Sequence, residues 1–174
     1  MVLEISLDEF DPDRQQAFAE VKPGRAHVIV TDWEENAING QWHRMKMEVV
    51  AHDEPGENGK IHSELFHAGA KAQWRLIRLA LATRLTTVEE LAALKEQGEY
   101  ATFDFADAIG RSMFVRFVQE TDRNGEKRIK LGRNLFAIDD PRCSGWPANP
   151  GILEREKQGG NETGGDAAAD AFGL

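Results

Sequence analysis

Aromatic and cationic side chains share one side of the stretch NGQWHRMKMEVV, at residues 39–50. Successive side chains of a β-strand point to opposite faces, so alternate residues line the same face. One face is then mostly apolar, with His43, Met45, Met47 and Val49, and the other carries Trp42, Arg44, Lys46 and Glu48. An ordinary solvated strand face rarely combines a tryptophan with two cations, so we interpret this face as a candidate binding surface.

Two later stretches repeat the combination. In SMFVRFVQE (112–120), Phe114 and Arg116 alternate with the apolar Met113, Val115 and Phe117. In RIKLGRNLFAI (128–138), cations alternate with apolar residues in the same way. Single-stranded DNA offers phosphates and exposed bases, which a binder without sequence preference contacts through a cationic groove and aromatic side chains. The candidate DNA-binding residues are Trp42, Arg44, Lys46, Phe114, Arg116, Arg128, Lys130 and Arg133.

Each candidate also has an ordinary structural role open to it. Trp42 could pack under the loop at 52–60, Phe114 could belong to the core, and the cations of 128–133 could prevent edge-to-edge pairing of sheets. Trp33 and Trp74 are assigned to the core. The binding interpretation gains support because three strands each present cations, two of them beside an aromatic residue.

The charge of the chain is unevenly distributed. The 174 residues hold 21 Lys and Arg against 30 Asp and Glu, a net charge of -9, which argues against a uniformly cationic nucleic-acid binder. Two segments, 67–85 and 108–138, nevertheless carry a net charge of +4 each. The sequence therefore predicts cationic regions within an acidic protein.

Several classes of protein are excluded by what the sequence lacks. A single cysteine, Cys143, rules out an intramolecular disulfide framework and a multi-cysteine zinc site, and the spacing of His62 and His67 suits neither a helical nor a strand metal pair. The nucleotide-binding and hydrolase motifs are absent, so we predict no enzyme, no metal and no cofactor. Without an apolar run of membrane length or a cationic leader, we expect no membrane association and a cytoplasmic location, that of the host cell if the protein is phage-encoded.

The pattern of the chain predicts mainly β structure with helices. Strands are expected at 25–35, 41–50 and 61–66, followed by a helix at 68–85 whose buried stripe is Trp74, Ile77, Leu81 and Leu85. A capping box predicts a second helix that stops at Gly98, and two further strands flank a turn at Asn124 and Gly125. Three strands, helical segments and two strands form the element order of a five-stranded OB-fold barrel with a helical insertion between strands 3 and 4.

The sequence resembles the DUF669 family of phage and prophage proteins over residues 18–138. The stretches that carry the resemblance are VKPGRAHVIV, QWHRMKMEVV, AKAQWRLIRLALA and DAIGRSMFVRFVQETDRNGEKRIKLGRNLF. In the last of these, Ile109, Gly110 and Arg111 stand where the family has Leu, Gly and Lys. Members of the family look like OB-fold single-stranded DNA-binding proteins, and the resemblance implies that fold and that function.

The predicted domains are an acidic leader at 1–22, an OB-fold single-stranded DNA-binding domain at 23–140, and a linker rich in Pro and Gly with an acidic disordered tail at 141–174. The segment from about Gly151 is expected to be dispensable for folding because its composition buries little apolar surface. Its end is similar to the acidic tails of bacterial and phage single-stranded DNA-binding proteins. That similarity implies recruitment of replication or recombination partners through Asp166, Asp170, Phe172 and Leu174.

We therefore predict a single-stranded DNA-binding protein without sequence specificity that serves phage-type replication or recombination. The alternative is an OB-like protein-interaction module without nucleic-acid binding, whose acidic surface would suit a basic partner. Association of several copies of the chain is left open by the sequence.

Overall fold

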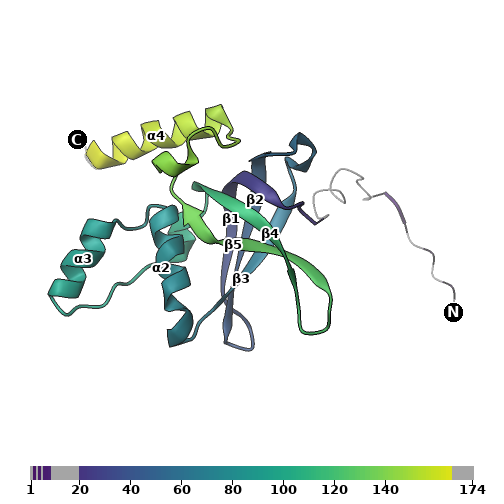
Figure 1. Cartoon of the computed structure of the whole chain (residues 1–174), viewed down its shortest axis with the longest axis horizontal. Coiled ribbons are helices and arrows are strands. Elements are labelled where there is room, and N and C mark those ends of the chain that lie inside the picture. Colours follow the sequence, from purple (N-terminus) through teal and green to yellow (C-terminus); the bar gives the residue numbers. More distant parts are fainter. Residues whose placement is uncertain (1, 3, 5, 9–19, 166–174) are drawn as a thin grey trace.

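The computed structural model describes residues 2, 4, 6–8 and 20–165. Five strands form one antiparallel sheet in the order β3-β2-β1-β4-β5 (Figure 1). The strands are β1 (Gly24–Ile38), β2 (Trp42–His52), β3 (Ile61–His67), β4 (Ser112–Thr121) and β5 (Lys127–Phe136). The α-helices are α2 (Gln73–Ala82), α3 (Val88–Glu96) and α4 (Pro150–Gly165), and the short 3-10 helices are η1 (Pro55–Glu57), η2 (Ala70–Ala72), η3 (Phe105–Ala108) and η4 (Pro141–Cys143).

The first three strands form an antiparallel meander, and the two strands that flank the predicted turn pair as a hairpin. β1 pairs with β2 and β2 with β3, and β4 pairs with both β1 and β5, all antiparallel. The β4–β5 turn forms where the sequence placed it, because Asp122 Oδ1 accepts hydrogen bonds from the backbone of Asn124 (2.8 Å) and Glu126 (2.9 Å). Gly125 supplies the positive φ of 79° that such a turn favours.

The inner face of the sheet holds the main core. Met45, Met47 and Val49 of β2 are fully buried there, as the alternation predicted. Met113, Val115 and Phe117 of β4 are buried in the same core, together with residues of β1 and Phe66 of β3. The alternation of apolar and polar residues therefore identified the inner face of β2 and β4 correctly, because the apolar face of each strand is buried in the core.

The sheet is not closed into a barrel, and α2 spans its two edge strands, β3 and β5. Arg75 donates to the Leu65 carbonyl of β3 (3.0 Å) and to Glu64, while Arg78 donates to the Arg133 carbonyl of β5 (3.0 Å). The buried Glu64 carboxylate also accepts a hydrogen bond from the backbone of Leu131 on β5 (3.2 Å). The Glu64 side chain and helix α2 thus connect the edge strands β3 and β5, which do not pair through backbone hydrogen bonds.

The predicted buried stripe of α2 is wrong in two of its members. Trp74 and Ile77 are 43% and 40% exposed, whereas Leu79 and Ala80 are fully buried. The helix carries apolar residues on more than one side, so periodicity alone favoured the side with the larger residues. The assignment of Trp74 to the core is wrong for the same reason, whereas Trp33 packs against the core as expected.

The capping box forms as predicted and starts α3. Thr87 Oγ1 accepts the hydrogen bond of the Glu90 backbone amide (3.1 Å). No residue of α3 is buried, and Figure 1 shows the helix standing away from the sheet. The predicted stop at Gly98 also agrees with the structure, because Gly98 follows the last helical turn with a φ of 69°.

The predicted end of the fold at residue 140 requires correction. Residues 141–149 pack on the outer face of the sheet, where Cys143 and Trp146 join Phe114 and Phe136 in a second apolar cluster. The chain continues into α4, so the segment expected to be disordered from Gly151 is helical to Gly165. The composition predicts a linker here, but Pro141 and Pro150 begin η4 and α4, and the residues between these helices pack on the sheet.

Candidate nucleic-acid interface

The outer face of β2 carries the side chains that the alternation placed there. Trp42, Arg44 and Lys46 are half-buried, and they point away from the core that holds Met45 and Met47. Trp42 lies edge-on against His67 of β3, with ring centroids 4.7 Å apart. Arg44 pairs with Glu34 of β1 (3.1 Å), which leaves Lys46 as the member of the set without an ion pair among the described residues.

A hollow of about 560 Å³ lies between the two edge strands of the sheet. Lys46 of β2 and Arg128 of β5 both line it, although they are far apart in the sequence. Its remaining lining residues are Glu20, Val21, Ile61, His62, Ser63 and Ile129. The open edge of the sheet thus brings cations from two of the three predicted strands to one concave site.

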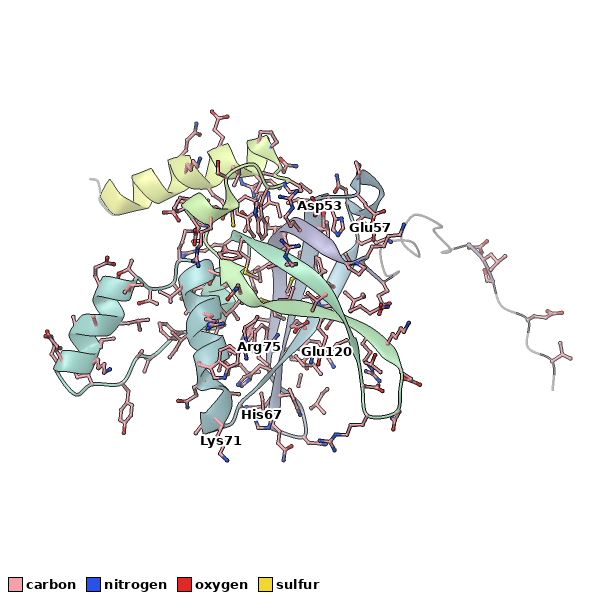
Figure 2. The ribbon with its side chains drawn as sticks, in the orientation of Figure 1. Asp53, Glu57, His67, Lys71, Arg75 and Glu120 are labelled. Carbon is pink, nitrogen blue, oxygen red and sulfur yellow. The ribbon has the colours of Figure 1, made fainter. Side chains whose placement is uncertain are left out.

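The cations of β5 are exposed, and two of them form ion pairs. Arg128 contacts Asp122 (3.1 Å), and Lys130 contacts Glu120 (3.5 Å), both on the same hairpin. Figure 2 labels Glu120 over this part of the sheet. Arg133 is exposed and makes no ion pair within the described part of the chain. We define the β2/β5 surface as Trp42, Arg44, Lys46, Arg128 and Lys130.

The prediction that Phe114 contacts DNA is wrong. Phe114 is 3% exposed and packs in the cluster with Phe136, Cys143 and Trp146. It does lie on the outer face of β4, as the alternation predicted, but residues 141–149 cover that face. Phe114 is therefore a buried packing residue, which was the alternative role open to it.

Arg116 belongs to a different part of the surface. It faces Arg25 across the β1–β4 pair, and both guanidinium groups lie over the Trp146 ring, at 5.5 and 5.7 Å from its centroid. Arg25 is held by Asp53 through a bidentate ion pair (2.7 Å), and that pairing lowers the pKa of the Asp53 carboxyl. The structure therefore does not unite all the predicted DNA-binding residues on one surface.

Several cations of the two predicted cationic segments have structural roles. Arg75 pairs with the buried Glu64, and Arg84 pairs with Glu156 of α4. Arg111 donates to the carbonyls of residues 83 and 84 (3.1 and 2.8 Å) and so binds the end of α2. These three arginines contribute to net charge but are held by protein partners, so net charge overstates the cationic surface available to a ligand.

A buried hydrogen-bond chain links β1, β4 and α4. The Asn149 amide donates to Nδ1 of His27 (3.0 Å), so Nε2 carries the proton and donates to Ser112 Oγ (2.7 Å). The Ser112 hydroxyl in turn donates to the Glu156 carboxylate, which also accepts from the Ser112 amide (2.7 Å) and from Arg84. Burial lowers the pKa of His27 to about 4 and keeps the imidazole neutral.

This chain of hydrogen bonds is not the catalytic triad of a hydrolase. In a triad the histidine accepts the proton of the serine, whereas here His27 donates and the fully buried Ser112 passes its proton toward a carboxylate. The groups instead attach α4 and residue 149 to the sheet. Sequence reasoning did not find this network because its members are spread from residue 27 to residue 156.

No cluster of three or more His, Cys, Asp or Glu side chains within 20–165 is arranged to hold a metal ion. No helix in the described part of the chain is long and apolar enough to cross a membrane. The predicted partner-binding residues Asp166, Asp170, Phe172 and Leu174 lie outside the described residues.

Comparison with known proteins adds no identification. No protein-family model matches the chain, and no curated protein matches it at a significant level. The predicted site residues did not include the exposed Trp74 or the half-buried Trp146. Arg78 lies over the Trp74 ring, and Arg116 lies over the Trp146 ring. The i, i+4 spacing of Trp74 and Arg78 is a signal that could have identified the first pair.

Proposed function

We propose that this chain binds single-stranded DNA without sequence specificity, through the β2/β5 surface, in phage-type replication or recombination. The observation that carries the proposal is the convergence of Lys46 and Arg128 on the hollow between the edge strands. A single strand can follow such a cationic groove with its phosphates while a base stacks on a neighbouring aromatic side chain. Trp42 lies two alternating positions along β2 from Lys46 and is the candidate for that stacking.

The ion pairs on this surface do not prevent phosphate binding. Arg44, Arg128 and Lys130 pair with carboxylates that are themselves partly exposed. Exposed pairs of this kind contribute about 0 to 1 kcal/mol each, so a phosphate can replace the carboxylate at small cost. Release of counterions from the DNA then favours binding, most strongly at low salt.

The fold and the resemblance support the same proposal. We interpret the five-stranded sheet as an OB-fold that is open between β3 and β5, with α2 in the position of the helical insertion. We also propose membership of the DUF669 family. Ile109-Gly110-Arg111, one of the features on which the resemblance rests, precedes β4 and includes a glycine whose φ is 90°.

A protein-interaction module without nucleic-acid binding is the second candidate. It is favoured by the pairing of three of the four cations of the β2/β5 surface and by the separation of Arg116 from them. Binding of oligo-dT at low salt distinguishes the two functions.

The test is fluorescence anisotropy of labelled oligo-dT titrated with the full chain at several salt concentrations. The logarithm of affinity should fall with the logarithm of salt, with a slope of about -0.7 per phosphate neutralised. The Lys46→Ala and Arg128→Ala double variant should weaken binding and flatten that slope. Trp42→Ala should weaken binding by about 1 to 3 kcal/mol, the value of one stacked base.

Lys157→Ala is the matched control, because Lys157 is an exposed cation on α4 without an ion pair among the described residues. It should leave both affinity and slope unchanged. Absence of binding at low salt, or equal affinity for single-stranded and duplex DNA, would refute the proposal. An equal loss in Lys157→Ala and the double variant would show that binding is not localised to the β2/β5 surface.

A further inference from the structure

The large exposed apolar side chains of the body all belong to the chain segment between β3 and β4. Apart from Val2 and Leu7 near the N-terminus, the described residues of this kind are Trp74, Ile77, Val88, Tyr100 and Ile109. Trp74 and Ile77 lie three residues apart on α2, and therefore on one side of the helix. Val88 begins α3 and is 65% exposed. The helical insertion, defined as residues 70–98, thus carries an apolar surface without a partner in the described part of the chain.

Helix α3 as a whole also lacks a packing partner within the described part of the chain. Leu91 and Leu94 are only half-buried, and its other apolar residues, Val88, Ala92 and Ala93, are exposed. Helices of globular proteins gain most of their stability from packing an apolar face, and a nine-residue helix is too short to be stable alone in water. Its isolation in Figure 1 therefore indicates a missing partner.

The charges of the insertion identify the kind of partner. Lys71, just before α2, and Arg78 on it make no ion pair among the described residues, whereas the buried Glu64 neutralises Arg75, so this helix presents a charge of +2. α3 contains Glu89, Glu90 and Glu96 against one lysine, a net charge of -2. A uniformly acidic or basic partner would be attracted to one helix and repelled by the other. A second copy related by a two-fold axis matches both helices, because each basic α2 can meet the acidic α3 of the other copy.

We infer that the helical insertion is a self-association surface on which a second copy of this chain packs, with α2 of each copy against α3 of the other. The contact removes Trp74, Ile77 and Val88 from water and gives α3 the packing it lacks. The inference is independent of the proposed DNA binding, because the β2/β5 surface does not include residues 70–98.

The test uses two charge-altered full-length chains, Lys71→Glu with Gln73→Glu and Glu89→Lys with Glu96→Lys, which keep the contact of Arg78 with β5 intact. Sedimentation equilibrium of the wild type should show a dimer, and each variant alone should dissociate at least about tenfold more readily because its two helices repel those of its copy. An equimolar mixture should restore the dimer, since each reversed helix then meets its complement. Restoration on mixing also excludes misfolding as the cause of dissociation.

Arg123→Glu with Lys127→Glu is the matched control, because both cations lie at the exposed β4–β5 turn. Its self-association should equal that of the wild type. A wild type that is monomeric over the whole concentration range overturns the inference, and so does a mixture that stays monomeric. Loss of oligo-dT affinity in Trp74→Ala at unchanged molecular mass would also overturn it and assign the insertion to nucleic acid.

Discussion

Replacing Glu156 tests whether α4 is part of the folded domain. Its carboxylate accepts hydrogen bonds from the amide and hydroxyl of Ser112 and from Arg84, and its side chain is 8% exposed. Glu156→Ala leaves the buried Ser112 amide without its partner, which costs about 1 to 3 kcal/mol. Loss of the ion pair with the partly exposed Arg84 adds to this, so we expect a destabilisation of about 3 kcal/mol.

In a chain of 174 residues, that free energy corresponds to a fall of about 6 to 12 °C in melting temperature. Differential scanning calorimetry measures it, with Glu154→Ala as the control, because Glu154 is exposed on the same helix. The control should melt within about 2 °C of the wild type. Ending the chain at residue 150 should destabilise it at least as much as Glu156→Ala, because Leu153 is then lost from the second apolar cluster. If Glu156→Ala and Glu154→Ala melt alike, α4 is not held to the sheet and the domain ends near residue 149.

Two further predictions follow from the outer face of the sheet. The pKa of His27 is lowered from 6.5 to about 4, so the unfolded chain binds the extra proton between these values and stability should fall by about 3 kcal/mol as the pH drops from 7 to 4. Urea unfolding should show this decline, a smaller decline in His27→Gln, and a decline like that of the wild type in the half-exposed His43→Gln. Phe114→Ala should cost about 3 to 5 kcal/mol of stability as a buried aromatic while the folded protein keeps its affinity for oligo-dT. An affinity loss in Phe114→Ala without destabilisation would contradict the burial of this side chain.

Local chemistry in the sequence predicted much of the strand and helix pattern. Alternation identified the inner face of β2 and β4, since a strand with one apolar side has only one way to face a core. Thr87 with Glu90 predicted the start of α3, and Asn124 with Gly125 predicted the β4–β5 turn, because these short motifs satisfy their own backbone groups. Such features depend on residues within a few positions of one another.

Tertiary contacts decided which of the predicted surfaces stay open to solvent. Phe114 and Trp42 have the same alternating pattern, but only Phe114 is covered, because a segment more than 25 residues later folds over β4. The choice between the two apolar sides of α2 depended on where β3 and β5 lie, so periodicity could not exclude an exposed Trp74.

The sequence by itself determined how many cations the chain has and where they are along it, whereas only the tertiary structure decided which of them a ligand can reach. Arg75 and Arg84 are indistinguishable from free surface cations in the sequence. In the folded chain they are held by Glu64 and by Glu156, the second of these 72 residues away from Arg84. Lys46 and Arg128 show the reverse case, because the open edge of the sheet brings them to one hollow. Charges interact through space and not along the chain, so their pairing could be known only once the fold had brought distant segments together.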